Sequence, residues 1–143
     1  MEFDHFLFAQ NALYEQVLRE LGAGQKQSHW MWFIFPQLRG LGFSAISRQF
    51  ALDSVDAAGR YLGHEVLGSR LRECTQRVLN IKNRTAEQIF GYPDWMKFRS
   101  SMTLFSLGSA PETVFQRAID EYFAGVPDSR TLELLGLGGG VGG

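Results

Sequence analysis

The fold is set by one dense apolar stretch, residues 28–38, which reads SHWMWFIFPQL. Aromatic and aliphatic side chains follow one another there without the alternation of a half-buried strand, so we expect a short buried helix. Ser28 can cap the start of this helix, and Pro36 disfavours helical geometry at the residue before it, which places the end there. The turn Gly40-Leu41-Gly42 then separates this helix from the next, which Ser44 can cap.

Helical patterns continue on both sides of this stretch. Apolar residues recur at intervals of three and four from Phe3 to Leu21, which predicts an amphipathic helix in the N-terminal segment. Thr85 and Gln88 form a capping-box pattern, and Asp128 can start the last helix. Strict alternation of polar and apolar residues is nearly absent. The sequence therefore predicts an all-α fold, a compact single-domain bundle of about seven or eight helices, several of them short.

The domain organisation follows from the length and the distribution of glycine. A chain of 143 residues has the usual size of one domain, and we assign residues 1–136 to a single helical domain. Residues 137–143 are nearly all glycine and have nothing to bury, so we expect a disordered glycine-rich tail there.

The composition argues against several functional classes. The formal net charge is −1 and the basic residues are dispersed, whereas nucleic-acid-binding domains usually carry a clear basic excess. The longest apolar run, residues 30–35, is too short to cross a membrane, and we recognise no signal peptide. The single cysteine, Cys74, provides neither a disulfide nor a Cys/His set for a metal. We therefore expect a cytoplasmic protein with no metal site and no cofactor.

Residues 26–44 form the first candidate site. Aromatic residues lie there beside polar side chains that a segment buried only in the core would not need. This combination is typical of a ligand pocket. His29 can change protonation near neutral pH and is the candidate catalytic acid or base. The alternative is purely structural. In it, the aromatic side chains belong to the core, the polar groups are solvated at its edge, and residues 40–44 are an ordinary turn before a capped helix. We expect ligand contacts from Ser28, Trp30, Trp32, Gln37, Arg39 and Ser44.

Residues 94–103 form the second candidate site, because polar side chains interrupt a strongly apolar helix there. We expect Lys97, Arg99, Ser100 and Ser101 to contact an anion. Lys97 and Ser101 are four residues apart and share a helix face, but a Ser–Lys nucleophile requires a desolvated lysine, so we disfavour it. Alternatively, the hydroxyl groups bond to carbonyl groups one turn back within a helix–helix contact.

The stretch 28–38, together with Gly40-Leu41-Gly42, resembles the signature of the family known as domain of unknown function 1810. The resemblance covers nearly the whole chain and extends to residues 61–64, 67–71, 89–91, 97–105 and 131–136. It implies a mostly helical fold and a family without an assigned activity. Some members are labelled calpastatin, a function that nothing in this sequence supports.

The aromatic and cationic side chains of the two candidate segments together predict that the protein binds a small anionic ligand, which is nucleotide-like or phosphate-bearing. The enzymatic form of this hypothesis is a hydrolase or transferase that uses His29, and the residues do not decide whether the protein is an enzyme. The alternative is a non-catalytic interaction module with an exposed aromatic patch for a partner chain or a second copy. A hollow surrounded by His29, Arg39 and Lys97 would favour a ligand, whereas a flat aromatic patch would favour a partner.

Overall fold

The computed structural model describes residues 1–109 and 111–137, and this part of the chain contains helices and no strand. The predicted all-α fold is confirmed, although the predicted number of helices is slightly low. The described residues form ten helices: α1 (Asp4–Asn11), α2 (Tyr14–Gly22), α3 (Met31–Ile34), α4 (Ala45–Gln49), α5 (Val55–Gly63), α6 (Glu65–Asn80), α7 (Ala86–Phe90), α8 (Asp94–Gly108), α9 (Val114–Phe123) and α10 (Ser129–Leu134).

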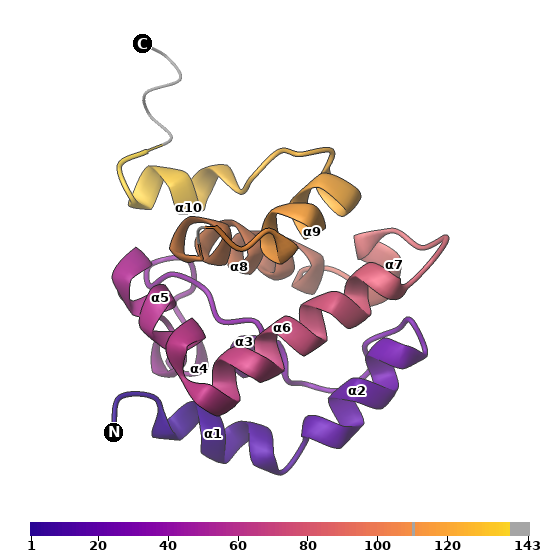
Figure 1. Cartoon of the computed structure of the whole chain (residues 1–143), viewed down its shortest axis with the longest axis horizontal. Coiled ribbons are helices and arrows are strands. Elements are labelled where there is room, and N and C mark those ends of the chain that lie inside the picture. The colour runs from indigo at the N-terminus through magenta and orange to yellow at the C-terminus, as the bar shows by residue number, and fades with distance from the viewer. Residues whose placement is uncertain (110, 138–143) are drawn as a thin grey trace.

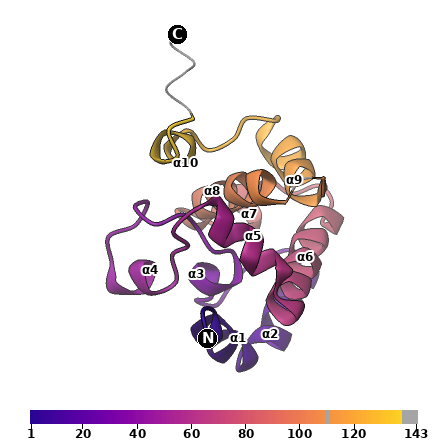
Figure 2. The same cartoon turned by 60° about the vertical axis from the view of Figure 1, so that its left-hand side comes forward.

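The helices lie in three rough layers (Figures 1 and 2). Helices α1 and α2 lie at the bottom of Figure 2 with α3 to α6 above them, and α8 to α10 lie at the top of both views. The short helix α3 contacts α1 below it and α8 above it, so the apolar stretch near residue 30 lies at the centre of the fold. None of the helices in the described part of the chain is both long and apolar enough to span a membrane.

The N-terminal segment forms two helices where the sequence predicted one. Helix α1 ends at Asn11 and α2 begins at Tyr14, with no glycine or proline between them. The break lets α1 pack against α3 while α2 packs against α6. It also orients the buried side chain of Gln10, whose Nε2 donates to the carbonyl oxygen of Phe33 at 2.7 Å. Tertiary contacts thus override a continuous helical pattern.

Side-chain caps begin three of the helices as the sequence predicted, and a fourth helix has a cap of the same kind. Ser44 and Asp128 cap α4 and α10, and their side-chain oxygens accept from the backbone three residues on. Ser54 caps α5 in the same way. Thr85 and Gln88 form the complete capping box of α7. These caps satisfy backbone donors that have no partner inside the helix.

The core contains a cluster of aromatic rings between α3 and α8. Trp30, Phe35 and Phe98 are fully buried. The ring centroids of Phe35 and Phe98 are 5.0 Å apart in an edge-to-face arrangement, and those of Phe98 and Phe90 are 4.6 Å apart and stacked. Such ring pairs add to the free energy gained from burying their area. This cluster joins α3 to α8 and fixes the relative positions of the two candidate segments.

The chain between α3 and α5 is held by a short backbone link. The backbone N–H of Leu52 donates to the carbonyl oxygen of Gln37 at 2.9 Å, and that of Arg39 donates to Leu52 at 2.8 Å. This isolated parallel bridge between Leu38 and Leu52 fixes the residues that leave α3. The predicted disordered tail, residues 137–143, lies outside the described residues apart from Leu137.

Candidate functional site

A cavity of about 440 Å³ lies between the two segments that the sequence analysis selected. The loop after α3 forms one wall, the start of α8 forms the opposite wall, and residues at the start of α10 close one side. The volume is within the range of small-molecule sites. The cavity is lined by Trp32, Gln37, Leu41, Phe43, Tyr92, Pro93, Met96, Lys97, Ser100, Asp128 and Arg130.

Lys97 and Trp32 connect the two walls directly. The Nζ atom of Lys97 lies 4.2 Å from the centre of the Trp32 ring, a cation–π contact. The same ammonium lies 3.0 Å from Oδ1 of Asp94, whose Oδ2 is 2.7 Å from Nζ of Lys26. An ammonium has three donors, and Asp94 accepts only one of those of Lys97. Lys97 therefore brings a fixed positive charge and spare donors to the cavity.

Asp94 is held in its charged form by the two lysines. Burial by itself would raise the pKa of Asp94, but the hydrogen bonds and charges of Lys26 and Lys97 outweigh burial and lower the pKa. The side chain of Lys26 is only 7% exposed, so this part of the bridge is nearly shielded from water. A shielded carboxylate between two lysines is a weak base, and its role is to position Lys97.

Gln37 lines the cavity and carries an unusual polar atom. The residue is only 6% exposed, and its Nε2 is buried without a hydrogen-bond partner among residues 1–109 and 111–137. Leaving a buried amide donor unpaired costs about 1–3 kcal/mol, so native proteins rarely do so without a reason. The bridge between Leu38 and Leu52 fixes the backbone that carries this side chain.

The rim of the cavity is apolar and exposed. Phe43 and Tyr92 are 75% and 77% exposed, and Met96 is also exposed. Deeper in the wall, the hydroxyl group of Ser100 donates to the carbonyl oxygen of Met96 at 3.0 Å, which leaves its lone pairs as acceptors. The site thus combines exposed rings at its mouth with polar groups further in, as small-molecule sites do.

Charges at and directly behind the cavity leave one positive charge. Asp128 caps α10 by accepting from the backbone N–H of Thr131 at 2.9 Å, and Arg130 lies two residues further along. Lys26, Lys97 and Arg130 are cations, whereas Asp94 and Asp128 are carboxylates. Three positive charges against two negative ones favour an anionic group in the cavity.

Ser28 and Trp30, two of the predicted ligand contacts, are engaged elsewhere. The Glu20 carboxylate accepts from the backbone N–H of Ser28 at 3.0 Å, from its hydroxyl group at 2.6 Å and from Nε1 of Trp30 at 2.9 Å. We call this arrangement the Glu20 clasp. Burial by itself would raise the pKa of Glu20, but these hydrogen bonds and that of the Gln27 N–H lower it to about 2. Ser28 also does not cap α3, which begins after Trp30.

The remaining predicted site residues lie away from the cavity lining. His29 is exposed, and Ser44 caps α4. Arg39 pairs with Asp53 at 2.5 Å. Arg99 donates to the carbonyl oxygen of Val126 at 2.9 Å and lies over the Phe123 ring, while Ser101 is fully buried in the core. The structure thus brings together Trp32, Gln37, Lys97 and Ser100 from the predicted set.

Sequence reasoning missed the residues that form the rim. Tyr92 lies between Gly91 and Pro93 at the start of α8, and an aromatic residue between two helix-breaking residues is a signal of exposure. Phe43 follows the glycine turn in the same way. No signal in the sequence marked Arg130 as a cavity residue, because its position at the cavity depends on how α10 packs against α8.

In the described residues, the fold is a helical domain with a donor-lined cavity between α3 and α8. The chain matches the family model described as "Protein of unknown function (DUF1810)" over residues 1–135 and belongs to this family, as the motifs predicted. The crystal structure of the conserved hypothetical protein Rv1873 from Mycobacterium tuberculosis at 1.38 Å matches with a TM-score of 0.93 and 44% sequence identity. That match covers 94% of this chain and 96% of the other. A search of curated proteins found no match.

Proposed function

We propose that the protein binds a small anionic ligand in the cavity between α3 and α8. The observation that carries this proposal is that Lys97 and Gln37 both line the cavity, and that the Nε2 of Gln37 is buried with no hydrogen-bond partner among the described residues. A ligand that accepts a hydrogen bond from Gln37 removes an energetic cost that the free protein bears. An anionic acceptor also engages the spare donors of Lys97, and hydrogen bonds to charged groups are the stronger ones.

The charges favour a ligand with a single negative group near Lys97. One unbalanced positive charge at the cavity matches a phosphodiester, a singly charged phosphate or a carboxylate better than a triphosphate. The exposed rings of Phe43 and Tyr92 provide a surface for an apolar or planar part of the ligand. The Lys97 ammonium already covers one face of Trp32, so a nucleotide-like ligand would stack on the rim rings instead.

The proposal is for binding and not for turnover. His29, the predicted acid or base, does not line the cavity. Asp94 has a lowered pKa and is a weak base, while burial raises the pKa of Cys74 to about 12 and keeps its thiol protonated. Nucleophilic catalysis needs a nucleophile beside a base, and the lining residues provide no such pair. We place this function in the cytoplasm, in keeping with the single, buried cysteine.

The experiment that tests the proposal is a thermal-shift screen of mononucleotides, cyclic nucleotides, sugar phosphates and aromatic carboxylates. A ligand at about 100 times its dissociation constant stabilises the fold by roughly 2.7 kcal/mol. We expect Gln37→Met and Lys97→Met each to weaken binding at least tenfold. His29→Ala and Arg99→Gln are the matched controls, because these residues were predicted contacts that lie outside the cavity lining. The proposal is wrong if no compound shifts the transition, or if the controls lose binding as much as the cavity variants.

A second candidate function rests on the exposure of Phe43, Tyr92 and Met96 around one rim. Exposed aromatic patches are typical of protein–protein contacts, and a second copy of the chain is the simplest partner. Sedimentation analysis over a wide concentration range tests this alternative. Self-association that the double change Phe43→Ser, Tyr92→Ser abolishes would favour an interaction module over a ligand site. A monomer at all concentrations would remove this form of the alternative.

A further inference from the structure

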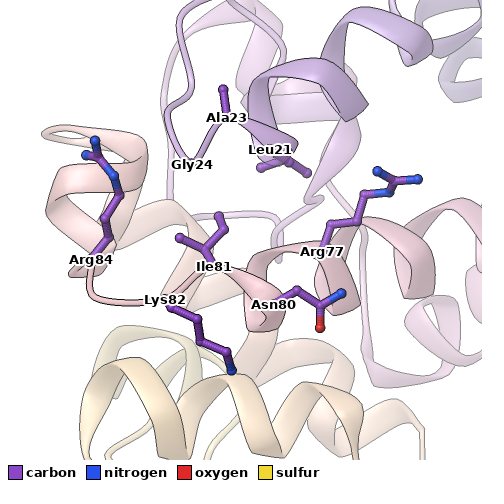
Figure 3. Close-up of a pocket in the computed structure, with 9 residues that line it drawn as sticks. Leu21, Ala23, Gly24, Arg77, Asn80, Ile81, Lys82 and Arg84 are labelled. Carbon is purple, nitrogen blue, oxygen red and sulfur yellow. The ribbon is translucent and has the colours of Figure 1, made fainter.

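A second hollow of about 350 Å³ lies on another part of the surface, where α2 and α6 both end. Figure 3 shows Leu21, Ala23 and Gly24 on one side of it and Ile81 on the other. This hollow shares no lining residue with the cavity between α3 and α8. It is therefore a separate feature, which the proposed function does not explain.

The lining of this hollow has an excess of positive charge. It includes three cations, Arg77, Lys82 and Arg84, and no carboxylate. Arg77 has a carboxylate partner, Glu73, at 3.4 Å, whereas Lys82 and Arg84 form no ion pair in the described part of the chain. The ends of α2 and α6 offset only part of the charge, because each helix C-terminus carries roughly half a negative charge. The remaining positive charge is complementary to an acidic partner.

Apolar side chains separate the cations of this hollow. Figure 3 shows the guanidinium groups of Arg77 and Arg84 on opposite sides, with Ile81 between them and the ammonium group of Lys82 directed away. A Cβ added to Gly24 would lie 3.4 Å from Nε of Arg84 and 3.5 Å from Cγ2 of Ile81. Arg84 and Ile81 thus pack against the same glycine, which places a charged group directly beside an apolar side chain.

This separation decides which class of anion suits the hollow. A compact ion with one charged centre cannot contact both guanidinium groups in this arrangement. Single-stranded nucleic acid is bound through aromatic rings on which its bases stack, and the described residues that line the hollow include no aromatic side chain. A peptide differs from both, because any number of residues can separate its carboxylates and an apolar side chain can lie between them.

The connection between α6 and α7 also carries free donors. Of the residues that the structure describes, none accepts a hydrogen bond from the backbone N–H groups of Lys82, Asn83 and Arg84, and all three residues are exposed. Nε2 of Gln76 donates to Oδ1 of Asn80 at 3.1 Å, which leaves Nδ2 of Asn80 as a further donor. A peptide has a carbonyl acceptor at every residue, so it suits a surface that is rich in donors.

We propose that this hollow is a docking site for an extended acidic segment of a partner protein. An apolar side chain of the segment lies over Ile81, and the acidic residues two positions before and after it pair with Arg84 and Arg77. Residues i, i+2 and i+4 of an extended chain face the same side, and the outer two are about 13 Å apart. Lys82 attracts the acidic segment at longer range. This docking site does not rest on the function proposed for the cavity beside Lys97.

The test is a titration of the full chain with synthetic peptides, followed by amide NMR shifts. The probe peptide has a central leucine, a glutamate two positions to each side of it, and serine at the other positions. We expect it to bind about fivefold more tightly than a peptide with serine in place of the leucine, and about tenfold more tightly than one with glutamine in place of both glutamates. No binding of the probe, or equal affinity for the serine peptide, would overturn the proposal.

The positions of the shifted amides locate the bound peptide. We expect shifts at Gly24, Ile81 and Lys82. Shifts near Trp32 together with a loss of binding in Lys97→Met would place the peptide in the first cavity and overturn the proposal. Displacement of the peptide by a single-stranded oligothymidylate at the same concentration would assign the surface to nucleic acid, which also overturns it.

Two pairs of variants separate this docking site from general charge attraction. Arg77→Gln and Arg84→Gln should each weaken probe binding about fivefold, whereas Arg117→Gln removes the same charge from an exposed position on α9 and should not. Ala23→Glu brings a carboxylate into the lining and should abolish binding. Ala12→Glu is its matched control, because both alanines are exposed C-caps of helices. Equal effects within either comparison would overturn the proposal.

Discussion

The ammonium group of Lys97 lies 4.2 Å from the centre of the Trp32 ring, so two residues 65 positions apart in sequence join the two candidate segments. Neither residue is there only to fill the core, because both are half-buried and line the same cavity. The contact covers the ring face that a planar ligand would otherwise use. It also places a cation where an incoming anion can reach it.

Removing the carboxylate behind this contact should destabilise the fold. In Asp94→Asn, the side chain of Lys26, which is only 7% exposed, would lose its anionic partner. Breaking a buried pair in this way costs about 3 kcal/mol, against about 0–1 kcal/mol for an exposed pair. The matched control is Asp53→Asn, because Arg39 and Asp53 are 50% and 73% exposed. Urea denaturation measures both, and equal losses of unfolding free energy would contradict the account.

Gln37→Met should make the free protein more stable while it weakens ligand binding. The change removes a buried donor that has no partner, so we expect a gain of about 1 kcal/mol in the free energy of unfolding. Such a gain at a binding site is the usual trade-off between stability and function.

The competing explanation for Gln37 is a trapped water. A much smaller hollow of about 10 Å³ also touches Trp32, Gln37 and Leu41, and that volume is about the minimum for one water molecule. If a water satisfies the amide there, Gln37→Met would lower stability instead. Calorimetric unfolding of the unliganded protein therefore separates the two explanations by the sign of the change.

Gly42→Ala should disturb the cavity wall from behind. A Cβ at this position would lie 2.7 Å from Cβ of Ser47 and 3.1 Å from Cη2 of Trp32. We expect a loss of about 1–2 kcal/mol from this overpacking, together with weaker ligand binding, because Trp32 must move. Gly63→Ala is the control, since an added Cβ meets nothing within 4 Å at the end of α5. That control should be neutral or slightly stabilising.

Acidification should weaken the Glu20 clasp in a defined pH range. The pKa of Glu20 is about 2 in the folded protein, against an ordinary value of 4.5. A carboxyl group whose pKa is lowered by folding stabilises the protein above the unfolded value and loses that contribution as the pH falls. The stability difference between the parent and Glu20→Gln should therefore be constant above about pH 5 and shrink towards about pH 2. Thermal unfolding at several pH values checks this, and a difference that does not change with pH would show that the clasp does not depend on charge.

Local signals in the sequence predicted the helices better than they predicted the site. Caps such as Ser44 and the Thr85–Gln88 box depend on a few adjacent residues, and they were confirmed. Ser28 carries the same signal, yet a carboxylate eight residues earlier takes its hydroxyl group. The break between α1 and α2 likewise has no local cause, because it follows from packing on α3 and α6.

The candidate site shows the same limit in its charged residues. Arg39 and Arg99 looked like anion contacts in the sequence, but each is drawn to a nearer acceptor, Asp53 for one and the Val126 carbonyl for the other. Lys97 and Gln37 looked no different from them. What distinguishes these two is burial and the partners available, and both depend on the complete fold.

The carboxylate shared by Lys26 and Lys97 has a consequence for how the site can be assembled. One oxygen of Asp94 faces a loop near the start of the chain, and the other faces a residue one turn along its own helix. A protein cut anywhere between Lys26 and Asp94 would leave one fragment with an ammonium and the other with the acid that neutralises it. The short motif around Trp32, transplanted into another scaffold, would therefore arrive without the counter-charge that sets its geometry.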